Sequence, residues 1–338
     1  MMHDYQQFYQ HFEQSFGILH KAALLTYQYN QRTQVYSKDK IKLYHYQAKQ
    51  AHPHKIPVLI VFSTVNRPEI LDLFPEQSFI AGLLDNGMDV YLVDWGYPDS
   101  KDQSLGMSAY LEYLSDCVRF IKQKHDQLNL LGVCQGGLLS LCYACMQKEI
   151  SKLVLISTPV DFATKQDSIA ALLKDVPIEE VIAKIGNVPG SWLTQFFLLQ
   201  RPVELIGKKY LQFMGNLHDE AKTEKFLFVE KWLHDTPDQT AQAYTELVKH
   251  FYQANQLVRD TLALDGKKIS LQQINVPILN IIARDDHIVP PAASRALKKY
   301  INPDQYSQRV FSAGHIGLYL SDRVRKRVPT CIAQWLQK

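Results

Sequence analysis

The sequence lacks a strong charge bias, a disulfide framework and an export signal. Its 338 residues carry a formal net charge of +3, with basic and acidic residues mixed, which argues against nucleic acid as a partner. Five cysteines are an odd number in a long chain and indicate reduced thiols. No basic stretch followed by an apolar one opens the chain, so we expect a cytoplasmic protein.

Long apolar runs and grouped metal ligands are also scarce. The longest uncharged run covers residues 128–146, but several glycines interrupt it, so it predicts a buried strand and helix rather than a membrane span. No glycine-rich phosphate loop or metal-ligand spacing stands out, and we expect neither a cofactor nor a metal. Cys142 and Cys145 lack a second pair of ligands, which favours core packing for both.

Apolar, β-branched runs alternate with helical patterns along most of the chain. Several runs are nearly continuous, as in parallel strands covered on both faces, so the sequence predicts a mostly parallel, doubly wound sheet of the α/β class. The predicted strands are residues 56–62, 88–93, 128–133, 152–156, 276–283 and 306–311. The predicted helices are residues 70–86, 107–125, 138–147, 292–300 and 324–337.

The alternation stops between residues 158 and 273, where helical patterns rich in Phe, Trp and Leu take over. We predict that 158–273 is an inserted helical cap over the carboxyl edge of the sheet, and that 41–157 and 274–338 form the α/β core. Residues 1–40 are predicted as an N-terminal helical segment. An aromatic stripe there either packs on its own domain or docks on a partner; it consists of Tyr5, Phe8, Tyr9, Phe12 and Phe16.

A strand, a tight turn and a helix meet at residues 130–137. The turn reads Gly-x-Cys-x-Gly, which is the nucleophile elbow of the α/β-hydrolase fold with Cys134 in the place of serine. Gly132 and Gly136 fit such an elbow because a side chain at either position would collide with its neighbours. The helix after the turn directs its positive dipole end at the sulfur and favours a thiolate.

The expected chain order is nucleophile, acid, histidine. His315 follows the last predicted strand on a loop of small residues and is the predicted base. Asp286, after the strand at 276–283, is the predicted acid that would orient its imidazole; Asp285 and Asp161 are the alternatives. His287 adjoins the acid and is predicted to face the substrate.

Several blocks, in order, resemble the catalytic subunit of polyhydroxyalkanoate synthases, of the short type that works with a second, dissimilar subunit. The blocks are Val65-Asn66-Arg67-Pro68, Asp94-Trp95-Gly96, Gly132-Val133-Cys134-Gln135-Gly136-Gly137, Thr158-Pro159-Val160-Asp161, Asp286-His287-Ile288-Val289-Pro290 and Gly314-His315-Ile316-Gly317. The similarity covers roughly residues 40–338. The long N-terminal extension of the single-subunit synthases is missing, which favours the two-subunit type.

This resemblance implies a triad of Cys134, Asp286 and His315 that joins (R)-3-hydroxyacyl groups from coenzyme A thioesters into polyester. It implies an oxyanion hole from the backbone amides of Gln135 and Val65, and a part for Asp286 in activating the 3-hydroxyl group. It also implies a second synthase subunit, a homodimer, and a place at the surface of polymer granules.

Two other functions fit parts of the sequence. A cysteine hydrolase, resembling dienelactone hydrolases or thioesterases, would share the fold and the elbow, although dienelactone hydrolases are shorter and lack the Asn-Arg-Pro and Asp-Trp-Gly blocks. A catalytically silent granule-associated protein would use the aromatic stripe alone. With 3-hydroxybutyryl-coenzyme A, insoluble polymer indicates the synthase and free acid alone the hydrolase, whereas full polymer production by Cys134→Ala would indicate the silent protein.

Overall fold

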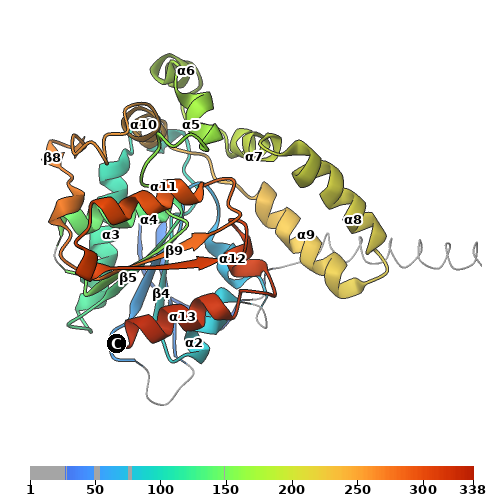
Figure 1. The fold of residues 1–338 in the computed structure, drawn as a ribbon, viewed down its shortest axis with the longest axis horizontal. Helices are drawn as coiled ribbons and strands as arrows, with labels where there is room; N and C mark the ends of the chain where they lie inside the picture. Colours follow the sequence, from blue (N-terminus) through green and yellow to red (C-terminus); the bar gives the residue numbers. More distant parts are fainter. Residues whose placement is uncertain (1–26, 28, 49–53, 75–77, 148) are drawn as a thin grey trace, which may run out of the picture.

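A central β-sheet with helices on both faces organises the chain (Figure 1). The structure is a computed structural model and describes residues 27, 29–48, 54–74, 78–147 and 149–338. The strand order in this sheet is β1-β2-β4-β3-β5-β6-β9-β10. Its strands are β1 (Thr33–Lys38), β2 (Ile41–Tyr46), β3 (Val58–Val61), β4 (Val90–Asp94), β5 (Asn129–Val133), β6 (Lys152–Ile156), β9 (Ile278–Ala283) and β10 (Tyr306–Phe311).

The sheet is mostly parallel, as predicted, and its antiparallel pairs are β1 with β2 and β2 with β4. The central strands β3, β5 and β9 are buried at every residue, which explains their nearly continuous apolar sequences. Because the strands are parallel, their carboxyl ends meet at one edge, where loops can gather functional side chains. The α/β-hydrolase architecture is therefore confirmed.

Two apolar cores cover the two faces of the sheet. One core contains α3 (Met107–Lys122), α4 (Gln135–Met146) and the segment of α11 (Pro291–Arg295) and η7 (Ala296–Lys299). The other contains α2 (Phe79–Asp85), α12 (Gly317–Leu320) and α13 (Arg327–Leu336). Helix α4 is apolar on all sides and buried from Gly136 to Cys145, as a helix within a core must be.

Two predictions near the N-terminus are wrong. Residues 33–38 of the predicted helical segment form strand β1, which pairs with β2 in a hairpin; the aromatic stripe lies outside the described residues. The predicted helix at 70–86 is instead the 3-10 helix η1 (Pro68–Asp72) followed by α2. A new helix starts there because the Ser78 hydroxyl caps it, accepting a hydrogen bond from the Ala81 amide at 2.9 Å.

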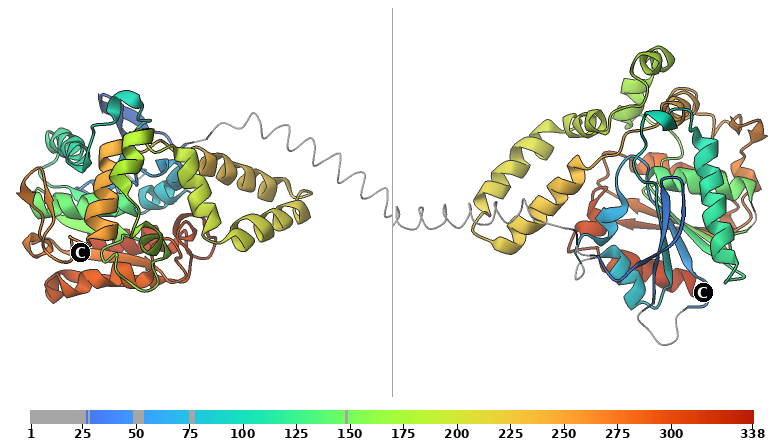
Figure 2. Two further views of the ribbon diagram at one scale, coloured as in Figure 1. Left: turned by 90° about the horizontal axis from the view of Figure 1, so that it is seen from above. Right: turned by 180° about the vertical axis from the view of Figure 1, so that it is seen from behind.

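The predicted cap, residues 158–273, lies between β6 and β9 and is called the insertion below. Its middle helices reach away from the sheet as an arm, and its C-terminal part returns to the core (Figures 1 and 2). The short strands β7 (Ala263–Leu264) and β8 (Lys267–Lys268), which the sequence did not indicate, form a hairpin near its end. Its helices are α5 (Ser168–Leu173), α6 (Ile178–Ile185), α7 (Gly190–Leu199), η4 (Val203–Lys208), α8 (Lys209–Gly215), α9 (Glu220–His234), α10 (Ala241–Glu246), η5 (Leu247–Gln253) and η6 (Leu271–Gln273).

The remaining described helices are single 3-10 turns in the connections of the core. They are η3 (Ser100–Asp102), after β4, and η8 (Pro303–Gln305), directly before β10. Asp99 caps the first through a reciprocal pair of hydrogen bonds with Asp102, and Asn302 caps the second. Both turns therefore bring the chain into or out of the sheet at defined points.

Candidate active site

Cys134 lies at the sharp turn between β5 and α4. Its backbone has φ 54° and ψ −123°, a conformation that costs energy for any residue with a side chain. The Cys134 amide donates to the Ile156 carbonyl of the neighbouring strand at 2.8 Å, which holds the turn against the sheet. The thiol is only half-buried, so this strained turn presents its sulfur at the carboxyl edge.

Two glycines make this turn possible. A Cβ atom on Gly132 would lie 2.5 Å from the Cα atom of Gly137, and one on Gly136 would lie 2.2 Å from the Val61 carbonyl oxygen. Real Cβ atoms do not approach so closely, and both obstacles are backbone atoms that cannot swing aside. The collision predicted from the sequence is therefore confirmed at both positions.

His315 and Asp286 form a buried pair beside the turn. Asp286 follows β9 and His315 follows β10, and the two strands are neighbours, so both side chains reach the same edge. The His315 Nδ1 atom lies 2.8 Å from Asp286 Oδ2, and the two side chains are 10% and 1% exposed. The other oxygen of Asp286 accepts hydrogen bonds from the amides of Ile288 and Val289 at 3.0 and 2.9 Å.

Opposing effects act on the protonation of this pair. Burial is the largest single effect on the pKa of His315 and lowers it, but the charges and hydrogen bonds of Asp286 and Cys134 together raise it more. The net result is a pKa well above the usual 6.5. Burial raises the pKa of Asp286, but the charge and hydrogen bond of His315 lower it more. Cys134, His315 and Asp286 thus lie together at one edge of the sheet.

The two alternative acids lie elsewhere. Asp285 pairs with Arg284 at 3.4 Å, and both side chains are 60% exposed. Asp161 accepts hydrogen bonds from the Ala163 amide and the Asn255 side chain, at 3.0 and 2.9 Å, which orders its own loop. Of the three candidate carboxylates, Asp286 is the one bonded to His315.

His287 lines a basic cavity next to this pair. Its ring is partly buried, and Nε2 has no hydrogen-bond partner among the described residues. Burial first and then the charge of Arg201 lower its pKa, so the neutral ring is favoured. The cavity has a volume of about 750 Å³, and its charged lining consists of three arginines and two carboxylates: Arg201, Arg284, Arg295, Asp285 and Asp286.

The two predicted oxyanion donors lie on adjoining segments. The Gln135 amide is the first of helix α4, where amides have no intrahelical acceptor. Val65 lies on the loop after β3, and its amide donates to the Ser63 hydroxyl at 3.0 Å. The side-chain oxygen of Gln135 accepts from the Thr64 hydroxyl at 2.7 Å, so the nucleophile turn and this loop are joined.

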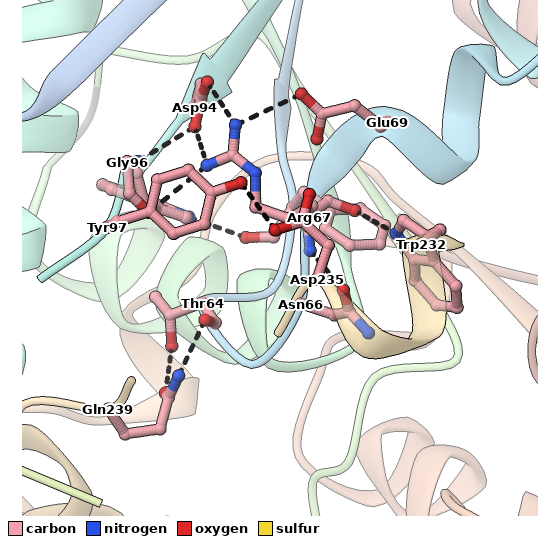
Figure 3. A network of polar contacts seen from close by, with 12 residues as sticks. Thr64, Asn66, Arg67, Glu69, Asp94, Gly96, Tyr97, Trp232, Asp235 and Gln239 are labelled. Carbon is pink, nitrogen blue, oxygen red and sulfur yellow. Dashed lines mark hydrogen bonds and ion pairs between the residues drawn. The ribbon is translucent and has the colours of Figure 1, made fainter. Parts of the chain in front are cut away.

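Sequence reasoning did not predict the polar network on the other side of the nucleophile turn (Figure 3). Arg67 Nη1 and Nη2 lie 2.6 and 2.8 Å from the two oxygens of Asp94, and Nη2 lies 3.2 Å from Glu69. Burial lowers the pKa of Arg67, but Glu69 and Asp94 raise it more. Arg67 and Asp94 belong to two of the blocks that carry the family resemblance, which marks both residues as candidates for a role. The sequence did not indicate that they pair with each other.

This network, called the Arg67 cluster below, also contacts the insertion. Trp232 Nε1 donates to the Arg67 carbonyl at 2.7 Å, and the Tyr97 hydroxyl donates to Asp235 at 2.7 Å. The Tyr97 ring lies 4.4 Å from the Arg67 guanidinium, within the range of a cation–π interaction. The loop after β3 is therefore held by both the core and the insertion.

The described ranges contain neither a metal-binding cluster nor a membrane-spanning helix. No group of three or more His, Cys, Asp or Glu side chains there is arranged to hold a metal ion. No described helix has the length and apolar character needed to cross a bilayer. Cys142 and Cys145 are buried in helix α4, and burial raises the pKa of Cys142 to about 12, as for a thiol packed in a core.

Comparison with known protein structures supports the fold. A family model described as "alpha/beta hydrolase fold" matches residues 67–322. A thermophilic esterase from Thermogutta terrifontis superposes with a TM-score of 0.56 at 15% identity, covering 91% of this chain and 98% of that one. A monoacylglycerol lipase from Paleococcus ferrophilus gives 0.51 at 17% identity, covering 87% and 98%. At these identities the likeness concerns the fold alone.

Curated relatives are much closer in sequence. A "Poly(3-hydroxyalkanoate) polymerase subunit PhaC" from Allochromatium vinosum is 41% identical over 310 residues, covering 90% of this chain and 87% of the relative. A protein of the same name from Synechocystis is 41% identical over 315 residues, covering 90% and 83%. The chain therefore belongs to the α/β-hydrolase fold family and, within it, to the family of poly(3-hydroxyalkanoate) polymerase subunit PhaC.

Proposed function

We propose that this protein is an acyltransferase that polymerises (R)-3-hydroxyacyl groups from coenzyme A thioesters into polyhydroxyalkanoate, through an acyl thioester on Cys134. The observation that carries the proposal is the buried His315–Asp286 pair beside a cysteine on a strained elbow, in a chain 41% identical to polymerase subunits. A cysteine suits this reaction because one thioester is exchanged for another, so the acyl group stays reactive toward an alcohol.

In the first step, the Cys134 thiolate attacks the carbonyl carbon of the thioester. The raised pKa of His315 supports an imidazolium beside the sulfur, which stabilises the thiolate before attack. The bond from carbon to the coenzyme A sulfur then breaks, and the proton of His315 passes to that departing sulfur. The negative oxygen formed in between would be held by the amides of Gln135 and Val65.

In the second step, the hydroxyl oxygen of the next 3-hydroxyacyl group attacks the acyl thioester. Its proton passes to His315, and Cys134 leaves as the thiolate. We propose that Asp286 acts through His315 rather than on the hydroxyl itself. Its side chain is 1% exposed, and its oxygens are engaged by His315 and by two backbone amides.

The basic cavity supports a substrate that carries phosphates. Arg201, Arg284 and Arg295 line it beside Asp286, and guanidinium groups match the geometry of phosphate oxygens. We propose that the nucleotide end of coenzyme A binds here and that the neutral His287 ring faces the substrate. Arg201→Gln should raise KM for the thioester about 10-fold with little change in kcat. An unchanged KM would place the nucleotide elsewhere.

We propose two roles for the insertion. As a cap it would exclude water, which would otherwise turn the transferase into a hydrolase. Its exposed apolar side chains support contact with a second synthase subunit or with polymer. We propose a homodimer that lies at the surface of polymer granules in the cytoplasm. These side chains are Leu172, Trp192, Leu199, Val203, Leu211 and Met214.

Incubation with 3-hydroxybutyryl-coenzyme A tests the function. We expect release of coenzyme A, formation of insoluble polymer, and an acyl adduct on Cys134 detected by mass spectrometry of a rapidly quenched reaction. Free 3-hydroxybutyrate without polymer, also in the presence of a partner subunit, would show a hydrolase instead. Polymer formed at the full rate by Cys134→Ala would leave the cysteine without a catalytic role.

A further inference from the structure

The loop after β3 receives two hydrogen bonds from the insertion. Gln239 Nε2 donates to the Thr64 carbonyl at 2.8 Å, and Trp232 Nε1 donates to the Arg67 carbonyl at 2.7 Å. Figure 3 shows these side chains reaching the loop from the insertion. The insertion thus fixes the backbone of the loop that follows β3 and adjoins the nucleophile turn.

Gln239 contacts the peptide unit that carries the predicted oxyanion donor. The Thr64 carbonyl and the Val65 amide belong to one planar trans peptide, so they point in opposite directions and turn together. A donor that holds the Thr64 oxygen therefore also sets the direction of the Val65 N–H. Without substrate, this N–H donates to the Ser63 hydroxyl, which an oxyanion would have to replace.

Gln239 is itself held firmly. Its side chain is buried, and Nε2 also donates to the Pro237 carbonyl at 3.2 Å. Its backbone exchanges two hydrogen bonds of 2.9 Å with Val188, just before α7. Since Nε2 serves two carbonyl groups, rotating the amide by 180° would place its oxygen against both of them. The orientation of this amide is fixed.

The Thr64 hydroxyl lies between two amide oxygens. It is 2.7 Å from Gln135 Oε1 and 2.9 Å from Gln239 Oε1, and its single proton serves one of them at a time. Gln135 follows the nucleophile and also supplies the other predicted oxyanion amide. Gln239, Thr64 and Gln135 therefore connect the insertion to both walls of the predicted oxyanion hole.

We propose that Gln239 is a positioning residue for acyl transfer, which holds the Thr64–Val65 peptide so that its amide faces the oxygen of the bound thioester. This inference rests on the proposed function. It makes the predicted oxyanion hole depend on the insertion, so that a movement of the insertion changes the rate of acylation. The role lies in the transition state, since the oxyanion is not present in the bound substrate.

Gln239→Met tests the proposal, because it keeps the length of the side chain and loses both polar atoms. The acylation rate constant with 3-hydroxybutyryl-coenzyme A should fall about 10- to 100-fold, short of the roughly 100- to 1,000-fold loss of a complete oxyanion donor. Alkylation of Cys134 by iodoacetamide forms no oxyanion. The rate of this alkylation should therefore differ less than about 2-fold between Gln239→Met and the original protein. Gln242→Met, on the exposed side of α10, is the matched control and should change neither rate.

Gln239→Glu provides a second test, whose readout is the pH dependence of the acylation rate. A folding defect would not produce this pH dependence. Protonated glutamic acid can donate to the Thr64 carbonyl, whereas glutamate cannot. The acylation rate relative to the original protein should therefore rise as pH falls. An unchanged acylation rate in Gln239→Met, or an equal loss of alkylation, would overturn the inference. Absence of acylation in the unaltered protein would instead refute the proposed function.

Discussion

Two buried ionic groups flank the nucleophile turn, and they differ in whether their protons can move. On one side, His315 pairs with Asp286 after the neighbouring strands β9 and β10. On the other, Arg67, which follows β3, pairs with Asp94, the last residue of the neighbouring strand β4. Histidine gains and loses a proton near neutral pH, whereas arginine stays charged. The same edge of the sheet thus carries a pair suited to proton transfer and a pair suited to holding a loop.

His315→Gln breaks the first pair and should have the largest effect. Turnover with 3-hydroxybutyryl-coenzyme A should fall by about three orders of magnitude or more, because the members of such a unit act together. His125→Gln is the matched control, since this ring contacts Asp89 and Tyr91 away from the nucleophile. Normal release of coenzyme A by His315→Gln would remove the base from the mechanism.

Asp94→Asn breaks the second pair and should mainly affect stability. It leaves the Arg67 charge buried beside Glu69 alone, and we expect a loss of about 3 kcal/mol in the free energy of unfolding. Asp116→Asn, in a partly exposed pair with Lys38, should cost less than about 1 kcal/mol. Urea unfolding measures both. A loss for Asp94→Asn as small as for the control would mean that the buried pair contributes little.

The pH dependence of stability separates the pairs further, with a smaller effect. The folded-state pKa of His315 is raised above 6.5, so its contribution to stability is full below pH 6.5 and is lost as pH rises through the folded pKa. The difference in unfolding free energy between the original protein and His315→Gln should therefore shrink with rising pH. Arg67 stays charged between pH 6 and 9, so its own contribution to stability should not change over this range. A constant difference for His315→Gln would contradict the raised pKa.

Much of the fold could be predicted because its signals are local. The buried strands are apolar runs, and the elbow combines a strand, glycines and a helix within a few residues of Cys134. The β1–β2 hairpin was missed although its signal is present. Ile41 and Leu43 are buried and Lys42 is exposed, an alternation typical of strands, but residues 41–46 are not among the predicted strands, and residues 33–38 lie in the segment predicted as helical.

The Arg67 cluster and Gln239 could not be predicted for a different reason. Arg67 and Asp94 are 27 residues apart, and Gln239 lies 175 residues from Thr64. Such partners meet only once the strand order and the path of the insertion are fixed, and no periodicity encodes them. The Asp286–His315 pair, 29 residues apart, was predictable because the fold places its acid and base after particular strands.

Helix α4 has a consequence for redesigning this polymerase family member. The helix supports the cysteine from within the core, and its side chains from Leu138 to Tyr143 are almost completely enclosed. Substitutions there would leave voids or overfill the interior, so attempts to change which monomers are accepted should leave it intact. Helix α8, in which no residue is buried, should tolerate exchange far better.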